Sequence, residues 1–138
     1  MVNGDELLTA DEILAMDDIA TEEVVVPEWG HRTVLVCGLT AAAKNAYEAS
    51  LVELKGTSRK VKLDNATAKL LVRCLVNRNR QPLFTEQQIE RLGTKSAAAL
   101  DRLATVAQRL SAMRQEDVEA LIKNSEAAQS GDSPSVSL

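Results

Sequence analysis

Within the part of this chain that follows residue 21, the spacing of apolar residues changes from a strand-like to a helix-like repeat at Gly38. Before that point, two β-branched runs at 22–26 and 33–37 flank a loop that contains proline and glycine. Alternate valines of each run fall on one face, so the two runs predict a β-hairpin with one apolar side. An isolated hairpin is marginal in water, and this side must therefore pack against the segments that follow.

Beyond Gly38 the apolar residues recur every three to four positions, which is typical of amphipathic helices. The clearest stripe consists of Ala68, Leu71, Val72, Leu75 and Val76. Caps and apolar faces together predict the helices. Three of them run over about 40–55, 64–76 and 85–92, and their caps are Thr40, Asp64 and Thr85. A further helix runs from Thr94 or Ser96 to about 110, and a last one begins at about 116. The predicted fold class is α+β, mostly α: a short N-terminal β-hairpin packed on a bundle of four to five helices.

Three parts of the chain are expected from its composition. Residues 1–20 form an acidic N-terminal arm, in which the capping box of Thr9 and Glu12 opens a short helix over about 9–17. Residues 21–124 carry the β-hairpin plus helical domain. Residues 125–138 are rich in Ala, Ser, Gly, Gln and Pro and are expected to be a disordered tail.

Charge is segregated along the chain, although the net charge is only −4. Residues 1–30 carry nine acids and no base, residues 31–114 carry fifteen bases and six acids, and residues 115–138 carry five acids and one base. Two interpretations stay open: a basic surface for a polyanion, or acidic ends that lie against the basic middle of this chain or of a neighbouring copy. We favour the second, because a net acidic protein repels nucleic acid at long range.

Sites of catalysis, metal or cofactor binding are not expected. His31, Cys37 and Cys74 lack the close ligand pairs of a zinc site. The segment 93–96, Gly-Thr-Lys-Ser, lacks the other glycines of a phosphate-binding loop. The single histidine has no neighbouring serine or cysteine nucleophile, so we expect no enzyme. No apolar run approaches the roughly 20 residues that span a bilayer, and neither membrane nor nucleic acid is expected as a partner.

Several short strings resemble one known family. They are Val24 to Gly30, Val34 to Thr40, Leu83-Phe84-Thr85, Leu92 to Leu103, Glu116 to Glu119, and Lys123-Asn124. In this order and spacing, the strings resemble the tail assembly chaperones of long-tailed, siphovirus-type phages and prophages, over about residues 22–124. The turn at 77–82 departs from the family, in which an Asp/Gly-rich turn is common.

The resemblance implies a non-enzymatic chaperone that binds the tape measure protein, keeps it soluble and promotes tail tube assembly. It implies a location in the host cytoplasm, absence from the mature virion, and a homo-oligomer, with the tail tube protein and a frameshifted longer form of the chain as further partners. The alternatives are a structural tail completion or connector component and a small nucleic-acid-binding regulator. We expect the client surface on the helices over about 64–110. The candidate partner-binding residues are Trp29, Leu83, Phe84, Leu103 and Leu110.

Overall fold

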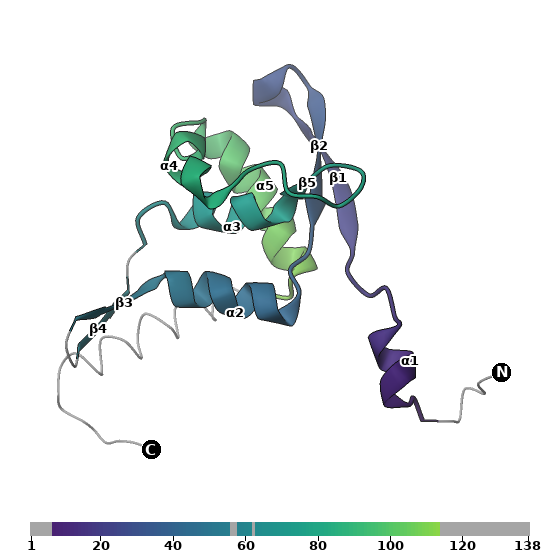
Figure 1. Cartoon of the computed structure of the whole chain (residues 1–138). Coiled ribbons are helices and arrows are strands. Elements are labelled where there is room, and N and C mark those ends of the chain that lie inside the picture. The colour runs from purple at the N-terminus through teal and green to yellow at the C-terminus, as the bar shows by residue number, and fades with distance from the viewer. Residues whose placement is uncertain (1–6, 56–57, 62, 114–138) are drawn as a thin grey trace.

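A computed structural model describes residues 7–55, 58–61 and 63–113, with the side chains of 53–61 excepted. Its elements confirm the α+β class (Figure 1). The helices are α1 (Ala10–Leu14), α2 (Ala41–Ser50), α3 (Ala66–Cys74), α4 (Ile89–Leu92) and α5 (Ala97–Leu110), with 3-10 turns η1 (Pro27–Trp29) and η2 (Glu86–Gln88). The strands are β1 (Thr21–Val26), β2 (Arg32–Cys37), β3 (Val52–Lys55), β4 (Ser58–Val61) and β5 (Leu75–Val76).

The predicted N-terminal hairpin is present. Strands β1 and β2 are antiparallel, with Val24 opposite Val34, and the alternate residues Val24 and Val26 are buried. The chain reverses through η1 and then Gly30, whose φ of +75° lies in the left-handed region that glycine adopts without strain. The backbone N–H of His31 donates to the carbonyl of Val26 at 3.1 Å and closes the turn.

The three-stranded sheet is completed by β5, where the helix predicted over 64–76 is corrected. The helix ends at Cys74, and Leu75 and Val76 pair with Val36 and Leu35 of β2. Their side chains remain buried, as the helical stripe requires, but their backbone groups bond to a strand that lies about 40 residues earlier in the chain. Long-range pairing therefore overrides the local helical repeat.

The helix predicted over 40–55 also ends early. Thr40 caps it as predicted, accepting from the Ala43 N–H at 3.0 Å, but α2 stops at Ser50 and β3 pairs with β4 in a second hairpin. The Ser50 hydroxyl donates to the Tyr47 carbonyl at 2.6 Å, and the Lys69 ammonium donates to the Ser50 carbonyl at 3.2 Å. Both groups take up carbonyls of the last turn, which favours a helix end.

Capping predictions are confirmed at three of the other helix starts. The arm helix α1 has the Thr9–Glu12 capping box, and Ser96, rather than Thr94, caps α5 by accepting from Ala99 at 3.2 Å. Thr85 begins a 3-10 turn before α4, with its N–H bonded to the Gln88 side chain at 2.9 Å. The prediction that Asp64 caps the next helix is wrong.

The residue before α3 is Asn65, which is left-handed (φ +55°) and makes no side-chain cap, since asparagine tolerates this conformation better than most residues. Helix α5 ends at Leu110, which confirms the break predicted near 111. The helix predicted from about 116 and the tail at 125–138 lie outside the described residues.

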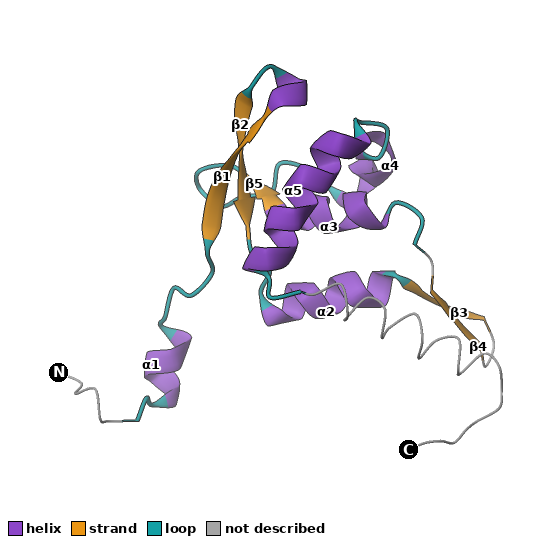
Figure 2. Cartoon of the chain, turned by 180° about the vertical axis from the view of Figure 1, so that it is seen from behind, coloured by secondary structure: helices purple, strands orange, loops and turns teal. Residues whose placement is uncertain are grey.

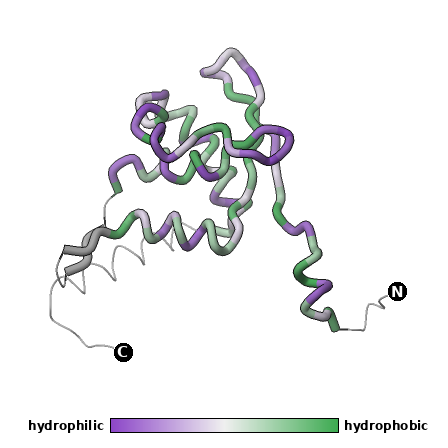
Figure 3. Tube along the Cα trace, in the orientation of Figure 1, coloured by the Kyte–Doolittle hydropathy of each residue, from purple (hydrophilic) through white to green (hydrophobic). Residues whose placement is uncertain are grey.

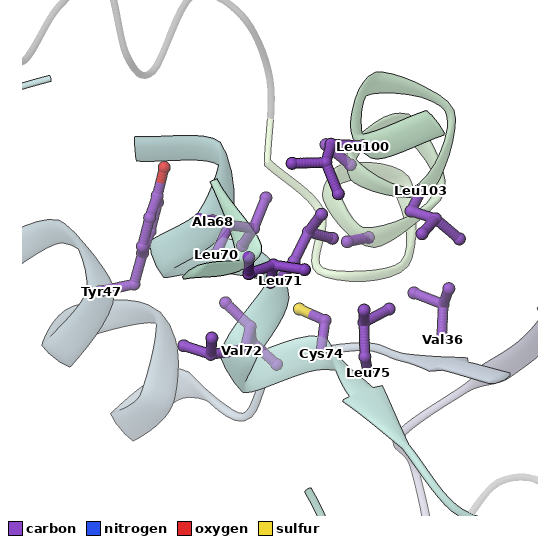
Figure 4. Packing of buried hydrophobic residues seen from close by; sticks show 14 of the residues in the cluster. Val36, Tyr47, Ala68, Leu70, Leu71, Val72, Cys74, Leu75, Leu100 and Leu103 are labelled. Atoms are coloured by element: carbon purple, nitrogen blue, oxygen red, sulfur yellow. The ribbon is translucent and has the colours of Figure 1, made fainter. Parts of the chain in front are cut away.

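Helices α3 and α5 pack against each other and against the sheet, and α2 packs on α3 (Figure 2). Their shared core is aliphatic, as Figure 4 shows around Leu71, Leu103 and Val36, all three fully buried. Tyr47 of α2 is the one aromatic side chain that the described residues bury almost completely. This core fixes the hairpin beside the helices and so sets the position of the hairpin turn.

Candidate partner-binding site

Two of the predicted partner-binding residues come together in the fold. Trp29 at the hairpin turn and Phe84 before η2 line one pocket of about 670 Å³, although 54 residues separate them in the chain. The Trp29–Phe84 pocket, as we call it, is lined by Trp29, Phe84, Gln88, Arg91, Leu92, Thr94 and Lys95. Both aromatic side chains are half-buried and pack against the core, so they are held in place with one side open.

The other three predicted residues are placed differently. Leu83 is 49% exposed, and its side chain is available at the surface next to Phe84 in sequence. Leu110 is half-buried at the end of α5 and packs against the core. Leu103 is fully buried, so it supports the core of this structure and presents nothing to a partner.

An ion pair fixes the wall of the pocket that the hairpin turn supplies. Glu28, beside Trp29, accepts a hydrogen bond from the Arg102 guanidinium of α5. A hydrogen bond from its own backbone N–H and this contact with Arg102 hold the pKa of Glu28 below its usual range. The turn and α5 are thereby tied together, and the negative charge nearest Trp29 is already paired.

The lining of the pocket also carries positive charge. Among the described residues that line it, Arg91 and Lys95 are basic and none is a carboxylate. Within the described part of the chain, neither of these two bases lies within salt-bridge distance of an acid. The pocket thus combines an aromatic and aliphatic surface with two cations, a combination that suits an apolar side chain flanked by carboxylates.

Most of these lining residues were not among the sequence-predicted site residues. Gln88, Arg91, Leu92, Thr94 and Lys95 join the pocket because the capping box at Thr85 turns the chain and α4 runs beside Trp29. The cap at Thr85 is visible in the sequence. Nothing in the sequence pairs this region with the hairpin turn.

The N-terminal acidic block lies against the basic middle of the same chain. Four ion pairs join them: Asp17–Arg80 at 2.9 Å, Glu22–Arg109 at 2.7 Å, Glu23–Arg78 at 3.0 Å, and Glu28–Arg102. Each pair spans at least 55 residues of sequence. The interpretation that the acidic N-terminal block faces basic residues of this chain is therefore confirmed for these positions.

The three residues considered as zinc ligands, His31, Cys37 and Cys74, differ in their exposure to solvent. Cys74 is fully buried and burial raises the pKa of its thiol to about 12, while Cys37 is half-buried and His31 is exposed in the hairpin turn. Across residues 7–55, 58–61 and 63–113, no three His, Cys, Asp or Glu side chains are grouped as metal ligands would be. In the segment 93–96, Thr94 donates to the Arg91 carbonyl and Ser96 caps α5, so both hydroxyls serve helix ends.

Comparisons with known proteins now define the class of this fold. The model of the phage tail assembly chaperone family matches residues 12–124, and the chain belongs to that family. A solved structure, that of the bacteriophage HK97 tail assembly chaperone, has a similar fold with a TM-score of 0.51 and 23% sequence identity. The match covers 70% of this chain and 92% of the HK97 chain. A comparison with curated proteins finds no match.

None of the helices described here combines the length and the apolar character that crossing a membrane requires.

Proposed function

We propose that this chain acts without catalysis, as a chaperone that binds the tape measure protein of its phage, keeps it soluble and promotes assembly of the tail tube around it. The observation that carries this proposal is the family match over residues 12–124, most of the chain. A long helical client would otherwise expose apolar stripes to water, and a chaperone of this kind covers them until the tube forms.

The surface proposed for partners combines the aromatic pocket with exposed leucine. Trp29 and Phe84 offer an open apolar pocket, and Leu83 offers an exposed side chain next to Phe84 in sequence. Leu110 contributes from the end of α5, and Leu103 supports this surface from the core. We place the client contact on the outer faces of the helices over 64–110.

Several copies are proposed to line one client, since one chain of this size covers only a short stretch of a long helix. Self-association is therefore part of the proposal, and the tail tube protein and a frameshifted longer form of the chain are proposed as further partners. The proposed division is an arm at 1–20, a body at 21–124 and a tail at 125–138. The proposed location is the host cytoplasm, with the protein absent from the finished virion.

Co-expression tests the client interaction directly. The tape measure protein of the same locus is expressed alone, with this chain, and with its Leu83→Ser variant. We expect the client to be soluble with the wild-type chain and largely insoluble alone, and Leu83→Ser to reduce the soluble fraction. Val25→Thr, which also changes a side chain about half exposed, is the matched control and should leave solubility unchanged. A client equally insoluble with and without the chain contradicts the proposal.

Mass spectrometry of purified virions separates a chaperone from a structural tail component. A chaperone is absent from virions, and a completion or connector protein is present in defined copy number. The nucleic-acid-binding alternative loses support because Arg78, Arg80, Arg102 and Arg109 already face acids of the same chain. A binding titration at low and moderate salt checks that alternative, which requires a salt-dependent affinity.

A further inference from the structure

The N-terminal arm exposes more apolar surface than a solvated segment normally does. Helix α1 buries none of its residues, and Figure 3 shows hydrophobic and hydrophilic residues side by side along it. Its large apolar side chains are between half and nine-tenths exposed: Leu7, Leu8, Ile13, Leu14 and Met16. Single exposed apolar residues are common on protein surfaces, but five large ones within ten positions are a concentration that is typical of an interaction site.

The same arm carries only negative side-chain charge. Asp11, Glu12, Asp17 and Asp18 lie within it, and no base occurs in residues 1–30. A helix of five residues is too short to be stable by itself in water, so its apolar side chains need a surface to pack on. The arm is therefore an acid-flanked apolar segment without a docking surface among the described residues of its own chain.

The Trp29–Phe84 pocket is complementary to that arm in both respects. Its aromatic and aliphatic walls match the exposed leucine, isoleucine and methionine side chains, and Arg91 and Lys95 match the arm carboxylates. Glu28, the acid next to Trp29 in sequence, forms an ion pair with Arg102. Its negative charge therefore repels an acidic ligand less than an unpaired carboxylate would. Charge and hydropathy thus favour the same occupant.

The geometry places this occupant on another copy of the chain. The arm leaves the fold at the Thr21 end of β1, where the Gly38 N–H donates to the Ala20 carbonyl at 2.9 Å. Trp29 lies beyond the opposite end of β1, about 20 Å away for a six-residue strand. Figures 1 and 2 show α1 and the hairpin turn at opposite ends of the hairpin.

A contact within one chain would need the linker 15–20 fully extended back along the strand, and it would need the Asp17–Arg80 ion pair broken. A contact between two chains needs neither change. We therefore propose that the arm at residues 7–18 of one copy docks in the Trp29–Phe84 pocket of a second copy, with Ile13 or Leu14 in the pocket and arm carboxylates at Arg91 and Lys95. Such a head-to-tail contact leaves one free arm and one free pocket, so it extends to rings or open helices.

This inference rests on the self-association in the proposed function and names the surfaces that would produce it. It can be tested in the absence of any client.

Trp29 is the only tryptophan, so its fluorescence reports on the pocket itself. We expect the emission of the full chain to shift to shorter wavelength as concentration rises, because a docked arm removes water from the indole. Sedimentation velocity at the same concentrations should show species larger than a monomer. The double variant Ile13→Ser, Leu14→Ser should weaken association about tenfold or more and remove the fluorescence shift. Val25→Thr, an exposed apolar position outside the arm, should behave as the wild type.

A mixing experiment separates docking between copies from a general loss of stability. The arm variant keeps an intact pocket, and the variant Arg91→Glu, Lys95→Glu keeps an intact arm. We expect each to remain monomeric alone and an equimolar mixture to form a dimer that grows no further, because only one complementary contact exists. Lys44→Glu on α2, which does not line the pocket, is the charge-reversal control and should still assemble.

Two results would overturn the inference. One is wild-type association by the arm variant, which places the contact between copies elsewhere. The other is a mixture of the two folded variants that stays monomeric. Client co-expression distinguishes these failures from failure of the proposed function. If the arm variant associates like the wild type while the wild-type chain solubilises the client, only the docking contact fails. If the wild-type chain assembles through the arm but leaves the client insoluble, only the client role fails.

Discussion

The Ser111 hydroxyl oxygen accepts a hydrogen bond from the backbone N–H of Leu39 at 2.9 Å, across 72 residues of sequence. Ser111 is the C-cap residue that follows the last residue of α5, and Leu39 joins β2 to α2. Both residues are buried, so no water is available to replace this bond. The contact holds the end of the longest described helix against the junction between the sheet and α2.

Replacing Ser111 with alanine should therefore destabilise the fold. The buried Leu39 N–H would lose its acceptor, and an unsatisfied buried donor costs about 1–3 kcal/mol. Chemical denaturation measures this difference in the free energy of unfolding. Thr105→Ala is the matched control, since its hydroxyl donates to the Asp101 carbonyl on an exposed helix face. The control should change stability by less than about 0.5 kcal/mol, and equal effects of the two variants would argue against the buried bond.

Gly38, next to Leu39, is required by close packing. A Cβ at this position would lie 2.7 Å from the carbonyl oxygen of Leu110, a backbone atom that cannot move without displacing α5. Gly38→Ala should cost about 1–3 kcal/mol and should speed hydrogen exchange of the Leu39 amide. Because it disrupts the same contact as Ser111→Ala, the two losses should be less than additive. Gly30→Ala, at the distant hairpin turn, should be additive with Ser111→Ala.

Burial of the Cys74 thiol should make the free energy of unfolding fall at alkaline pH. Its folded-state pKa of about 12 lies above that of an unfolded thiol, and burial also raises the pKa of Tyr47. A raised folded pKa contributes stability that is fully present below the unfolded pKa and is lost as pH rises toward the folded pKa. The free energy of unfolding should fall above about pH 9, by about 1.4 kcal/mol per pH unit from Cys74 alone.

Cys74→Ala should reduce that alkaline slope without abolishing it, because Tyr47 contributes in the same direction. Thiol labelling under native conditions supplies a second measurement. The half-buried Cys37 should react first, and Cys74 should react only as fast as the protein unfolds. Rapid native labelling of Cys74 would show that its surroundings are open to solvent.

Glu28 should make the free energy of unfolding fall at acid pH. Its folded-state pKa is lowered, first by a hydrogen bond from its own backbone and then by Arg102. The stability it contributes is present above the unfolded pKa and is lost as pH falls, from roughly pH 5 downward. Glu28→Gln should therefore flatten the acid limb of the stability profile, and Arg102→Met should flatten it in part. An acid limb unchanged by Glu28→Gln would contradict this role.

Leu103 and Leu83 separate support of the fold from contact with a partner. Leu103 is fully buried, and Leu103→Ala should cost about 3–5 kcal/mol through lost burial and a cavity. Leu83 is about half exposed, and Leu83→Ala should change stability by less than about 0.5 kcal/mol. If Leu83 contacts the client, its substitution lowers client solubility while thermal unfolding stays unchanged. A large shift in unfolding temperature for Leu83→Ala would assign it to the core instead.

Local chemistry was sufficient to predict several elements correctly. The hairpin at β1 and β2 follows from alternating β-branched residues around Pro27 and Gly30, a pattern decided within about 17 residues. The capping box at Thr9 and the caps at Thr40 and Ser96 follow from side chains three residues from their partners. Family membership was also readable, because it depends on the order of short strings.

Contacts between distant residues decided what the sequence analysis predicted incorrectly or left open. The sequence by itself determined that Leu75 and Val76 are buried, and only the fold decided that they are a strand, since β2 supplies their hydrogen-bond partners. It likewise marked Trp29 and Phe84 as notable, but only the packing of the hairpin and its turn on α5 lets Trp29 line one pocket with Phe84. The physical reason is the same in both cases: apolar periodicity encodes which side of an element is buried, whereas the partner it meets depends on the free energy of the whole packed chain.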